Sequence, residues 1–288
     1  MSRVTPALVA RMGDPIKGPS ALGSDRRRLV LLIWTLASTD FKLKFFGSVL
    51  GYLWQVMQPL MLFGVLYTVF SVVLDFSGTE EYFPVALLLG IVMFAFLNET
   101  SMGAIRSVGA REPLVRKIEF PRIAIPGAQV LLGLFNFGLN LIPVFVFLLL
   151  AGGKVRWTWL ELPVIMLLFA VLCLGLAMAL SALWVRYRDV DPIWAVALQA
   201  LFYASPILYA ISLVLEKSPK AAELMMFNPF AALLQQARHA LLGPSHPTPG
   251  AVMGNDAMLL IPLGIIFAVV IIGARIFVRM APVIAEEL

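Results

Sequence analysis

Long stretches without a charged residue alternate with short charged segments along this chain. Six such stretches occur: Phe45–Leu74, Tyr82–Asn98, Ile123–Gly153, Leu162–Val185, Pro192–Leu215 and Ala257–Ala274. A helix needs about 20 apolar residues to cross the roughly 30 Å hydrocarbon core of a bilayer. The pattern therefore predicts an all-α integral membrane protein with six transmembrane helices.

The composition agrees with this class. Hydrophobic residues make up 60% of the 288 residues and charged residues 14%, whereas globular domains have about 45–50% apolar and about 25% charged residues. The predicted helices occupy most of the chain. We therefore expect one transmembrane domain, residues 47–288, and no separate soluble domain.

The basic residues are distributed unevenly between the two sides of the predicted bundle. With six crossings both termini lie on one side, and 17 of the 22 Lys and Arg residues fall there. Short loops rich in Lys and Arg stay in the cytoplasm. We therefore predict that both termini are cytoplasmic, and that the net charge of +5 reflects topology rather than a nucleic-acid surface.

The N-terminal region divides into two parts. Residues 1–28 are predicted to be a flexible cytoplasmic tail, because Pro, Gly and Ser are frequent and periodicity is lacking. Residues 29–46 have the pattern of an amphipathic helix that lies along the membrane surface. Its polar face carries Thr35, Ser38, Thr39 and Lys42, and its apolar face carries Ile33, Ala37, Phe41 and Phe45. A cleaved signal peptide is the alternative, but no small-residue cleavage pattern follows.

Two segments between the predicted spans are unusual. Residues 102–122 are the most charged part of the chain and are predicted to be a cytoplasmic loop. Residues 216–256 are predicted to be external, and they contain a short apolar segment that Asn228-Pro229 interrupts before Ala231–Leu242 resumes helical spacing. A broken apolar segment of this length is typical of a re-entrant or interfacial element, whose backbone must be satisfied by protein or water.

Catalytic and metal-binding patterns are absent from the sequence. It contains no phosphate-binding G-x-x-x-x-G-K-[ST] loop and no H-E-x-x-H motif, and its one cysteine, Cys173, is expected to be a buried packing residue. His239 and His246 flank Gly243-Pro244 and are interpreted as solvent-facing loop residues. We therefore expect no catalytic residue, no metal site and no cofactor in this chain.

Few ionisable groups lie within the predicted spans. Glu99 is the only acidic residue near the body of one, and beside Asn98 and Thr100 it is interpreted as a solvated helix end. Asn136 and Asn140 share one face of the third span, where they either bond between helices or line a polar path. An ion-coupled carrier needs several buried ionisable groups. We therefore expect transport to draw its energy from another subunit.

Four local patterns occur in a fixed order along the chain. They are Asp40-Phe41-Lys42-Leu43-Lys44 with Gly47, Gly51, Trp54 and Pro59; Lys117-Ile118-Glu119-Phe120-Pro121-Arg122 with Pro126; Arg186-Tyr187-Arg188-Asp189; and Ser205-Pro206-Ile207-Leu208-Tyr209 with Asn228-Pro229-Phe230 and Arg238. Together they resemble the membrane-spanning permease of ABC exporters of lipid-linked polysaccharide, the O-antigen and teichoic-acid exporter family. Lys44-Phe45 departs from that family, which usually has Arg-Tyr there.

The resemblance implies a non-enzymatic transmembrane subunit that moves a lipid-linked polysaccharide (O-antigen, cell-wall glycan or teichoic acid) from the cytoplasm across the bacterial inner membrane. Two copies would form the channel among membrane lipids, and two separate ATPase subunits would bind ATP and Mg²⁺. A coupling helix in residues 102–122 would contact the ATPase. The implied contact residues are Arg111, Glu112, Arg116, Lys117, Glu119, Phe120 and Pro121, with Arg186, Arg188 and Asp189 in the turn before the fifth span.

The resemblance also implies a substrate path. At the substrate entrance, basic side chains would lie near the lipid pyrophosphate; the expected residues are Lys42, Lys44, Gly47, Gly51 and Trp54. An uncharged glycan is held by aromatic faces and hydrogen bonds, and the candidate channel residues are Tyr52, Tyr67, Phe202, Tyr203 and Tyr209. The external gate would consist of Asn228, Pro229, Phe230 and Arg238.

Two other functions stay open on the sequence alone. A small-lipid or drug ABC exporter permease is the related alternative. A membrane-embedded glycosyltransferase would need two loop aspartates that bind a metal and a sugar nucleotide. Asp189 and Asp191 have a suitable spacing for this, but they lie in a very short turn.

Overall fold

The computed structural model describes residues 26–45, 49–73, 82–111 and 121–287. Within these ranges the chain is helical and contains no strand. Five helical segments are long and apolar enough to cross a membrane: Gly51–Ser71, Phe83–Ala110, Ala124–Leu150, Trp157–Arg186 and Asp256–Met280. The predicted all-α membrane class is confirmed at this level.

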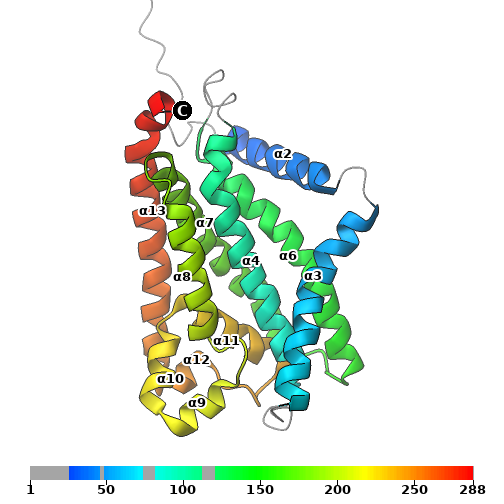
Figure 1. The fold of residues 1–288 in the computed structure, drawn as a ribbon. Helices are drawn as coiled ribbons and strands as arrows, with labels where there is room; N and C mark the ends of the chain where they lie inside the picture. The colour runs from blue at the N-terminus through cyan, green and yellow to red at the C-terminus, as the bar shows by residue number, and fades with distance from the viewer. Residues whose placement is uncertain (1–25, 46–48, 74–81, 112–120, 288) are drawn as a thin grey trace, which may run out of the picture.

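The long helices form a bundle that is open on one side (Figure 1). Helix α4 (Phe83–Ala110) lies at its centre and packs against α6 (Ala124–Leu150) and α7 (Leu162–Arg186). Helix α13 (Leu260–Glu287) packs along α7, while α3 (Val49–Tyr67) and its π-helical extension η1 (Thr68–Val73) lie at the other edge, where α3 packs against α4 and α6. Helix α4 contributes more residues to the core than any other helix and is apolar on every side along its first three turns.

The fifth charge-free stretch does not form one helix. Helix α8 (Val190–Ala204) has 15 residues, and a turn at residues 205–210 separates it from the short helix α9 (Ile211–Lys217). Pro206 favours the break, because a proline disfavours helical geometry in the residue before it, and Ser205 is extended, with φ −103° and ψ 149°. At 1.5 Å per residue α8 spans roughly 22 Å. The prediction of a single helix over Pro192–Leu215 is therefore wrong.

Helix α4 is longer than the sequence pattern predicted. It continues to Ala110, so that most of the residues assigned to a loop at 102–122 are either helical or outside the described ranges. Ala104, Ile105 and Val108 recur every three to four residues on the buried face and account for the extension. The loop therefore begins after Ala110 and not at residue 102, where the sequence pattern placed its start.

A separate helix, α2 (Arg26–Phe45), lies across the end of the bundle, steeply inclined to the other helices (Figure 1). The helix predicted at 29–46 is thus present, and it begins three residues earlier, within the expected tail. Its apolar face packs on the bundle: Ala37 is fully buried, and Trp34 and Phe41 both make edge-to-face contacts with Phe135 of α6. Lys42 on the polar face is exposed.

Short helices close the opposite end of the bundle. They are α10 (Pro219–Met226), α11 (Pro229–Leu242) and α12 (Pro249–Met253), followed by the 3₁₀ turn η4 (Asp256–Leu259). The predicted break at Asn228-Pro229 is confirmed: the Asn228 side chain accepts a hydrogen bond from the Phe230 amide, and Pro229 occupies the first helical position. At the other end of α11 the hydroxyl of Thr158 donates to the Ala240 carbonyl at 2.7 Å, which satisfies an acceptor that the helix leaves open.

The two histidines differ from their predicted placement. His246 is completely buried and His239 partly so, because the turn after α11 folds back on that helix. The Nδ1 atom of His239 lies 2.7 Å from the carbonyl oxygen of His246, and Gln235 donates to the Pro247 carbonyl at 2.9 Å. The interpretation of these histidines as solvent-facing is therefore wrong.

Two glycines allow α7 and α13 to pack closely. A Cβ on Gly273 would lie 2.1 Å from the carbonyl oxygen of Gly175, which is backbone and cannot rotate away. We expect Gly273→Ala to destabilise the fold by about 1–3 kcal/mol, seen as a lower thermal unfolding midpoint of the purified protein. Gly264→Ala in the same helix is the control, since nothing lies within 4 Å of its Cβ position. Equal midpoints for the two variants would contradict the prediction.

Candidate functional site

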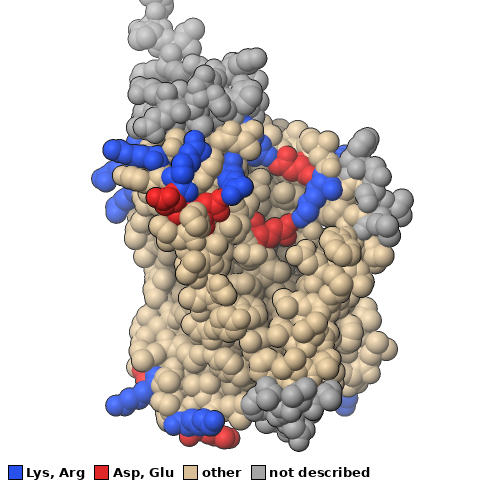
Figure 2. All heavy atoms as spheres, viewed as in Figure 1, with Lys and Arg blue, Asp and Glu red and all other residues tan. Residues whose placement is uncertain are grey.

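A cavity of about 990 Å³ lies between α3, α4 and α8 and opens to the outside. Several aromatic and amide side chains line it: Trp54, Gln58, Asn98, Gln199, Phe202 and Tyr203. Charged side chains gather at the two ends of the face shown in Figure 2, and most of the band between them carries none. The cavity therefore presents aromatic faces and amide groups, and the charged side chains of Lys44 and Glu99 also belong to its lining.

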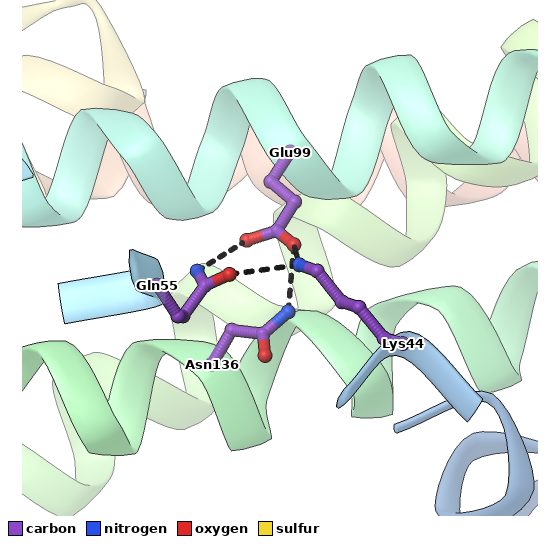
Figure 3. Close-up of polar contacts among 4 residues, drawn as sticks. All are labelled: Lys44, Gln55, Glu99 and Asn136. Atoms are coloured by element: carbon purple, nitrogen blue, oxygen red, sulfur yellow. Dashed lines mark hydrogen bonds and ion pairs between the residues drawn. The ribbon is translucent and has the colours of Figure 1, made fainter. Parts of the chain in front are cut away.

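Four helices contribute one polar side chain each to a cluster at the wall of this cavity (Figure 3). The ammonium of Lys44 from α2 lies 2.5 Å from Oε1 of Glu99 from α4 and donates to Oε1 of Gln55 from α3 at 2.8 Å. Asn136 of α6 donates to Glu99 Oε1 at 2.6 Å, and Gln55 Nε2 lies 3.4 Å from Glu99 Oε2. We call these four residues the Lys44–Glu99 cluster.

The position of Glu99 differs from the sequence interpretation. It lies eleven residues before the end of α4, and not at a solvated helix end, because α4 continues to Ala110. Its side chain is 32% exposed and that of Lys44 is 37% exposed. The ion pair is therefore reached by solvent through the cavity and not sealed in the core.

The two asparagines of α6 take different roles. Asn136 is fully buried and bonds between helices through its donation to Glu99. Asn140 is also buried and lines the cavity. The Oδ1 atoms of both have no hydrogen-bond partner among the described residues. Asn136 thus bonds between helices and Asn140 lines a polar cavity, so each of the two predicted roles holds for one of the two asparagines.

Two further ion pairs connect neighbouring helices near the C-terminal end of α4. Arg111, the residue after α4, contacts Asp40 of α2, and both side chains are largely buried. Arg106 of α4 donates from Nε to Oδ2 of Asp191 in the first turn of α8 at 2.7 Å. Arg106 therefore pairs with the carboxylate of Asp191, while Asp189 lies exposed before α8. Among the described residues no group of three His, Cys, Asp or Glu could hold a metal ion.

Some of the predicted entrance and channel residues line the cavity, and others do not. Lys44, Gly51 and Trp54 line the cavity, as do Phe202 and Tyr203. Three other aromatics lie elsewhere: Tyr52 stacks on Phe45, Tyr67 stacks on Phe63, and the Tyr209 hydroxyl donates to the Tyr203 carbonyl. Gly47 lies outside the described residues.

The residues predicted to form an external gate are held by packing and hydrogen bonds. Arg238 is 2% exposed, and its Nη2 donates to the carbonyls of Ala86 at 3.2 Å and Ile207 at 3.0 Å. It thereby joins α11 to the first turn of α4 and to the turn after α8. Asn228 donates to Ser205 Oγ at 3.2 Å, and Phe230 is buried against Phe94 and Phe169.

The predicted ATPase contacts lie only partly within the described ranges. Arg111 bonds to Asp40, and the Pro121 carbonyl accepts the Ala124 amide at the start of α6. Arg186 and Arg188 are exposed, with the guanidinium of Arg188 3.9 Å from the centre of the Trp184 ring. Asp189 precedes α8 without a side-chain cap bond. Glu112, Arg116, Lys117, Glu119 and Phe120 lie outside the described residues.

Sequence reasoning missed the glutamines of the cavity, Gln55, Gln58 and Gln199, and the Asp40–Arg111 contact. Gln55 and Gln58 were visible as the polar positions of a charge-free stretch, three residues apart on one helical face. That spacing is a signal for a polar surface on α3. Nothing local indicates that this surface meets α4 and α8.

The fold and the cavity define a multi-pass helical membrane protein with a polar cluster at the wall of a half-open cavity. The chain belongs to the ABC-2 type transporter family, which it matches over residues 31–242. The expected family resemblance is thereby confirmed.

Several named proteins are similar in sequence over most of the chain. The O-antigen export system permease protein RfbA of Klebsiella pneumoniae is 27% identical over 260 residues, 89% of this chain and 95% of that protein. RfbA of Myxococcus xanthus is 28% identical over 204 residues, 70% of this chain and 77% of that protein. The polysialic acid transport protein KpsM of Escherichia coli is 21% identical over 211 residues, 73% of this chain and 80% of that protein.

Proposed function

We propose that this chain is the transmembrane subunit of an ATP-driven ABC exporter that moves a lipid-linked polysaccharide from the cytoplasm across the bacterial inner membrane. The observation that carries the proposal is the cavity lined by Trp54, Phe202 and Tyr203 together with amide side chains, in a chain of the ABC-2 type transporter family. Sugar rings stack on aromatic faces and their hydroxyls bond to amides. The similarity to O-antigen and polysialic acid transport proteins supports this substrate class.

The proposed topology has six crossings with both termini in the cytoplasm. The fifth crossing is α8 together with the turn at 205–210, which continues from α8 toward the end that holds α9 to α12 (Figure 1). Helix α2 and the end of α13 lie at the same end of the bundle, which supports an even number of crossings. In this arrangement α2 lies in the cytoplasmic membrane interface.

The energy source is a separate ATPase that carries ATP and Mg²⁺ and docks at the end where α4 ends. Two copies of this chain would assemble with two ATPase subunits. The apolar residues that α8 exposes support a second copy or lipid on that face, since Ile193 is 66% and Val196 is 67% exposed. Residues 112–120 connect α4 to α6 and are the proposed docking segment.

The proposal is tested first by ATP turnover. The chain purified alone is expected to hydrolyse no ATP, whereas the complex with its ATPase should contain both subunits in equal numbers and hydrolyse it. Phosphate release by each preparation and quantitative gel staining measure the two quantities. Turnover by the isolated chain would refute a purely non-catalytic role.

Transport is tested next in vesicles. Reconstituted complex and ATP should move a fluorescent lipid-linked oligosaccharide across the bilayer, detected by its protection from an added glycosidase. ATP-dependent movement of a dye or short-chain lipid, with no movement of the glycolipid, would instead identify an exporter of small lipids or drugs.

A further inference from the structure

The Lys44–Glu99 ion pair lies where a ligand in the cavity reaches it. Both residues line the cavity, together with Trp54 and Gln58. We propose that Glu99 competes with an anionic ligand for Lys44. Its carboxylate occupies the position beside the Lys44 ammonium that a phosphate-type group of the ligand takes when it binds. This inference rests on the proposed function and deepens it, because it adds an internal competitor at a basic residue that the family resemblance places near the lipid pyrophosphate.

The geometry of Lys44 suits an exchange of partners. Lys44 is the penultimate residue of α2, and its ammonium carries three donors, two of which are used by Glu99 and Gln55. Its side chain is 37% exposed, so that an incoming anion approaches the ammonium without first breaking the fold. A phosphate group with several acceptor oxygens and more than one negative charge attracts this ammonium more strongly than one carboxylate does.

The partial exposure of the pair decides whether it can be displaced. A sealed ion pair is hard to break because separation leaves a charge buried without compensation. An ion pair accessible to water contributes little net free energy, because water solvates both groups when they separate. With 37% and 32% of the two side chains exposed, the Lys44–Glu99 pair belongs to the second kind.

Glu99 also keeps hydrogen-bond donors after Lys44 leaves. Asn136 donates to its Oε1 at 2.6 Å, and Gln55 Nε2 lies 3.4 Å from its Oε2. The carboxylate of Glu99 therefore still accepts hydrogen bonds after Lys44 has moved away. Lys44 is the only contact of the cluster that comes from α2, so the exchange would also release the end of α2 from α4 while Asp40 and Arg111 stay in contact.

The alternative is that the pair is a fixed brace between α2 and α4. The two roles predict opposite effects of removing the carboxylate charge. If Glu99 competes with the ligand, Glu99→Gln frees Lys44 and tightens anion binding. If the pair is only a brace, the same change leaves binding unchanged or weakens it.

The test uses the complete complex with its ATPase in phosphatidylcholine nanodiscs, titrated with a polyprenyl diphosphate as the probe. We expect Glu99→Gln to lower the dissociation constant by about two- to fivefold, the range for removal of an exposed ion pair. In a Lys44→Gln background the same change should have no effect, because the site that Glu99 blocks is gone. An unchanged or weaker affinity of Glu99→Gln with Lys44 present overturns the proposal.

A second measurement is independent of any change at Glu99. Lys44→Gln alone should reduce the preference for polyprenyl diphosphate over the uncharged polyprenol by about tenfold, the effect of one charge-assisted contact, and Lys44→Arg should restore most of it. An unaltered preference in Lys44→Gln overturns the proposal. Glu216→Gln and Lys220→Gln make the same chemical changes at exposed positions and should leave both quantities unchanged.

The source of the anion is distinguished by competition. If inorganic pyrophosphate displaces the lipid probe, the free anion is sufficient for the site; if it does not, the anion must be presented as a lipid head group. Either result is compatible with the exchange at Lys44, whereas absence of binding by both probes overturns it. Assembly with the ATPase and basal ATP turnover are recorded for each variant, so that loss of the anion site is distinguished from failure of the proposed exporter function.

Discussion

Ala195→Trp is expected to reduce export of the lipid-linked glycan by more than about tenfold while the complex still assembles. Ala195 lies on α8 and lines the cavity, so an indole ring at this position fills space that the substrate would occupy. A substrate that must displace a packed indole faces a penalty above the 1.4 kcal/mol that corresponds to a tenfold change. Transport in reconstituted vesicles measures the effect, and ATP turnover of the same vesicles confirms assembly.

Ala195→Ser is the matched control for this experiment. It changes the same residue of the cavity lining but adds only one oxygen atom, so the space for the substrate stays open. Export should be close to that of the unmodified protein. If both variants transport equally well, the cavity between α3, α4 and α8 is not the substrate path.

Arg238→Met is expected to lower the thermal unfolding midpoint by on the order of 10 °C. The guanidinium of Arg238 satisfies the carbonyls of Ala86 and Ile207 in the interior, and methionine has a similar length but no donor. Leaving buried acceptors without a donor costs about 1–3 kcal/mol for each group. Melting of the purified protein, followed by intrinsic tryptophan fluorescence, measures the shift.

Two variants make this experiment specific. Lys220→Met makes a similar loss of charge at an exposed position on α10 and should not change the midpoint. Arg238→Lys should restore only part of the stability, because an ammonium lacks the planar fork with which arginine reaches two acceptors. A midpoint of Arg238→Met within 1–2 °C of the unmodified protein would show that α11 is held by its apolar contacts alone.

Local features of the sequence predicted the elements that depend on short-range rules. The apolar period of residues 29–46 predicted α2 and its buried face, and Asn228-Pro229 predicted the start of α11. The break after α8 also agrees with a local rule, since Pro206 disfavours helical geometry at Ser205. It was missed because the absence of charge was given more weight than the proline.

The errors at Glu99 and His246 have a different origin. Whether Glu99 lies at a helix end depends on how far α4 continues, and the extension to Ala110 is stabilised by packing of Val108 against Ile125 and Met178 of neighbouring helices. The burial of His246 depends on a turn that folds back on α11. Charge and polarity near a residue do not reveal such contacts, so Glu99 was wrongly placed at a helix end and His246 was wrongly placed at the surface.

The sequence by itself determined the membrane class, the family and the residues available for a site, because hydropathy and local motifs depend on neighbouring residues. Only the tertiary structure brought together Lys44, Glu99 and Asn136, which lie 55 and 37 residues apart along the chain. It also created the cavity, whose lining residues come from α2, α3, α4, α6, α8 and the turn after α8. The physical reason is that helix packing, which depends on how side chains of distant segments fit together, decides which polar groups meet and which remain open to a ligand.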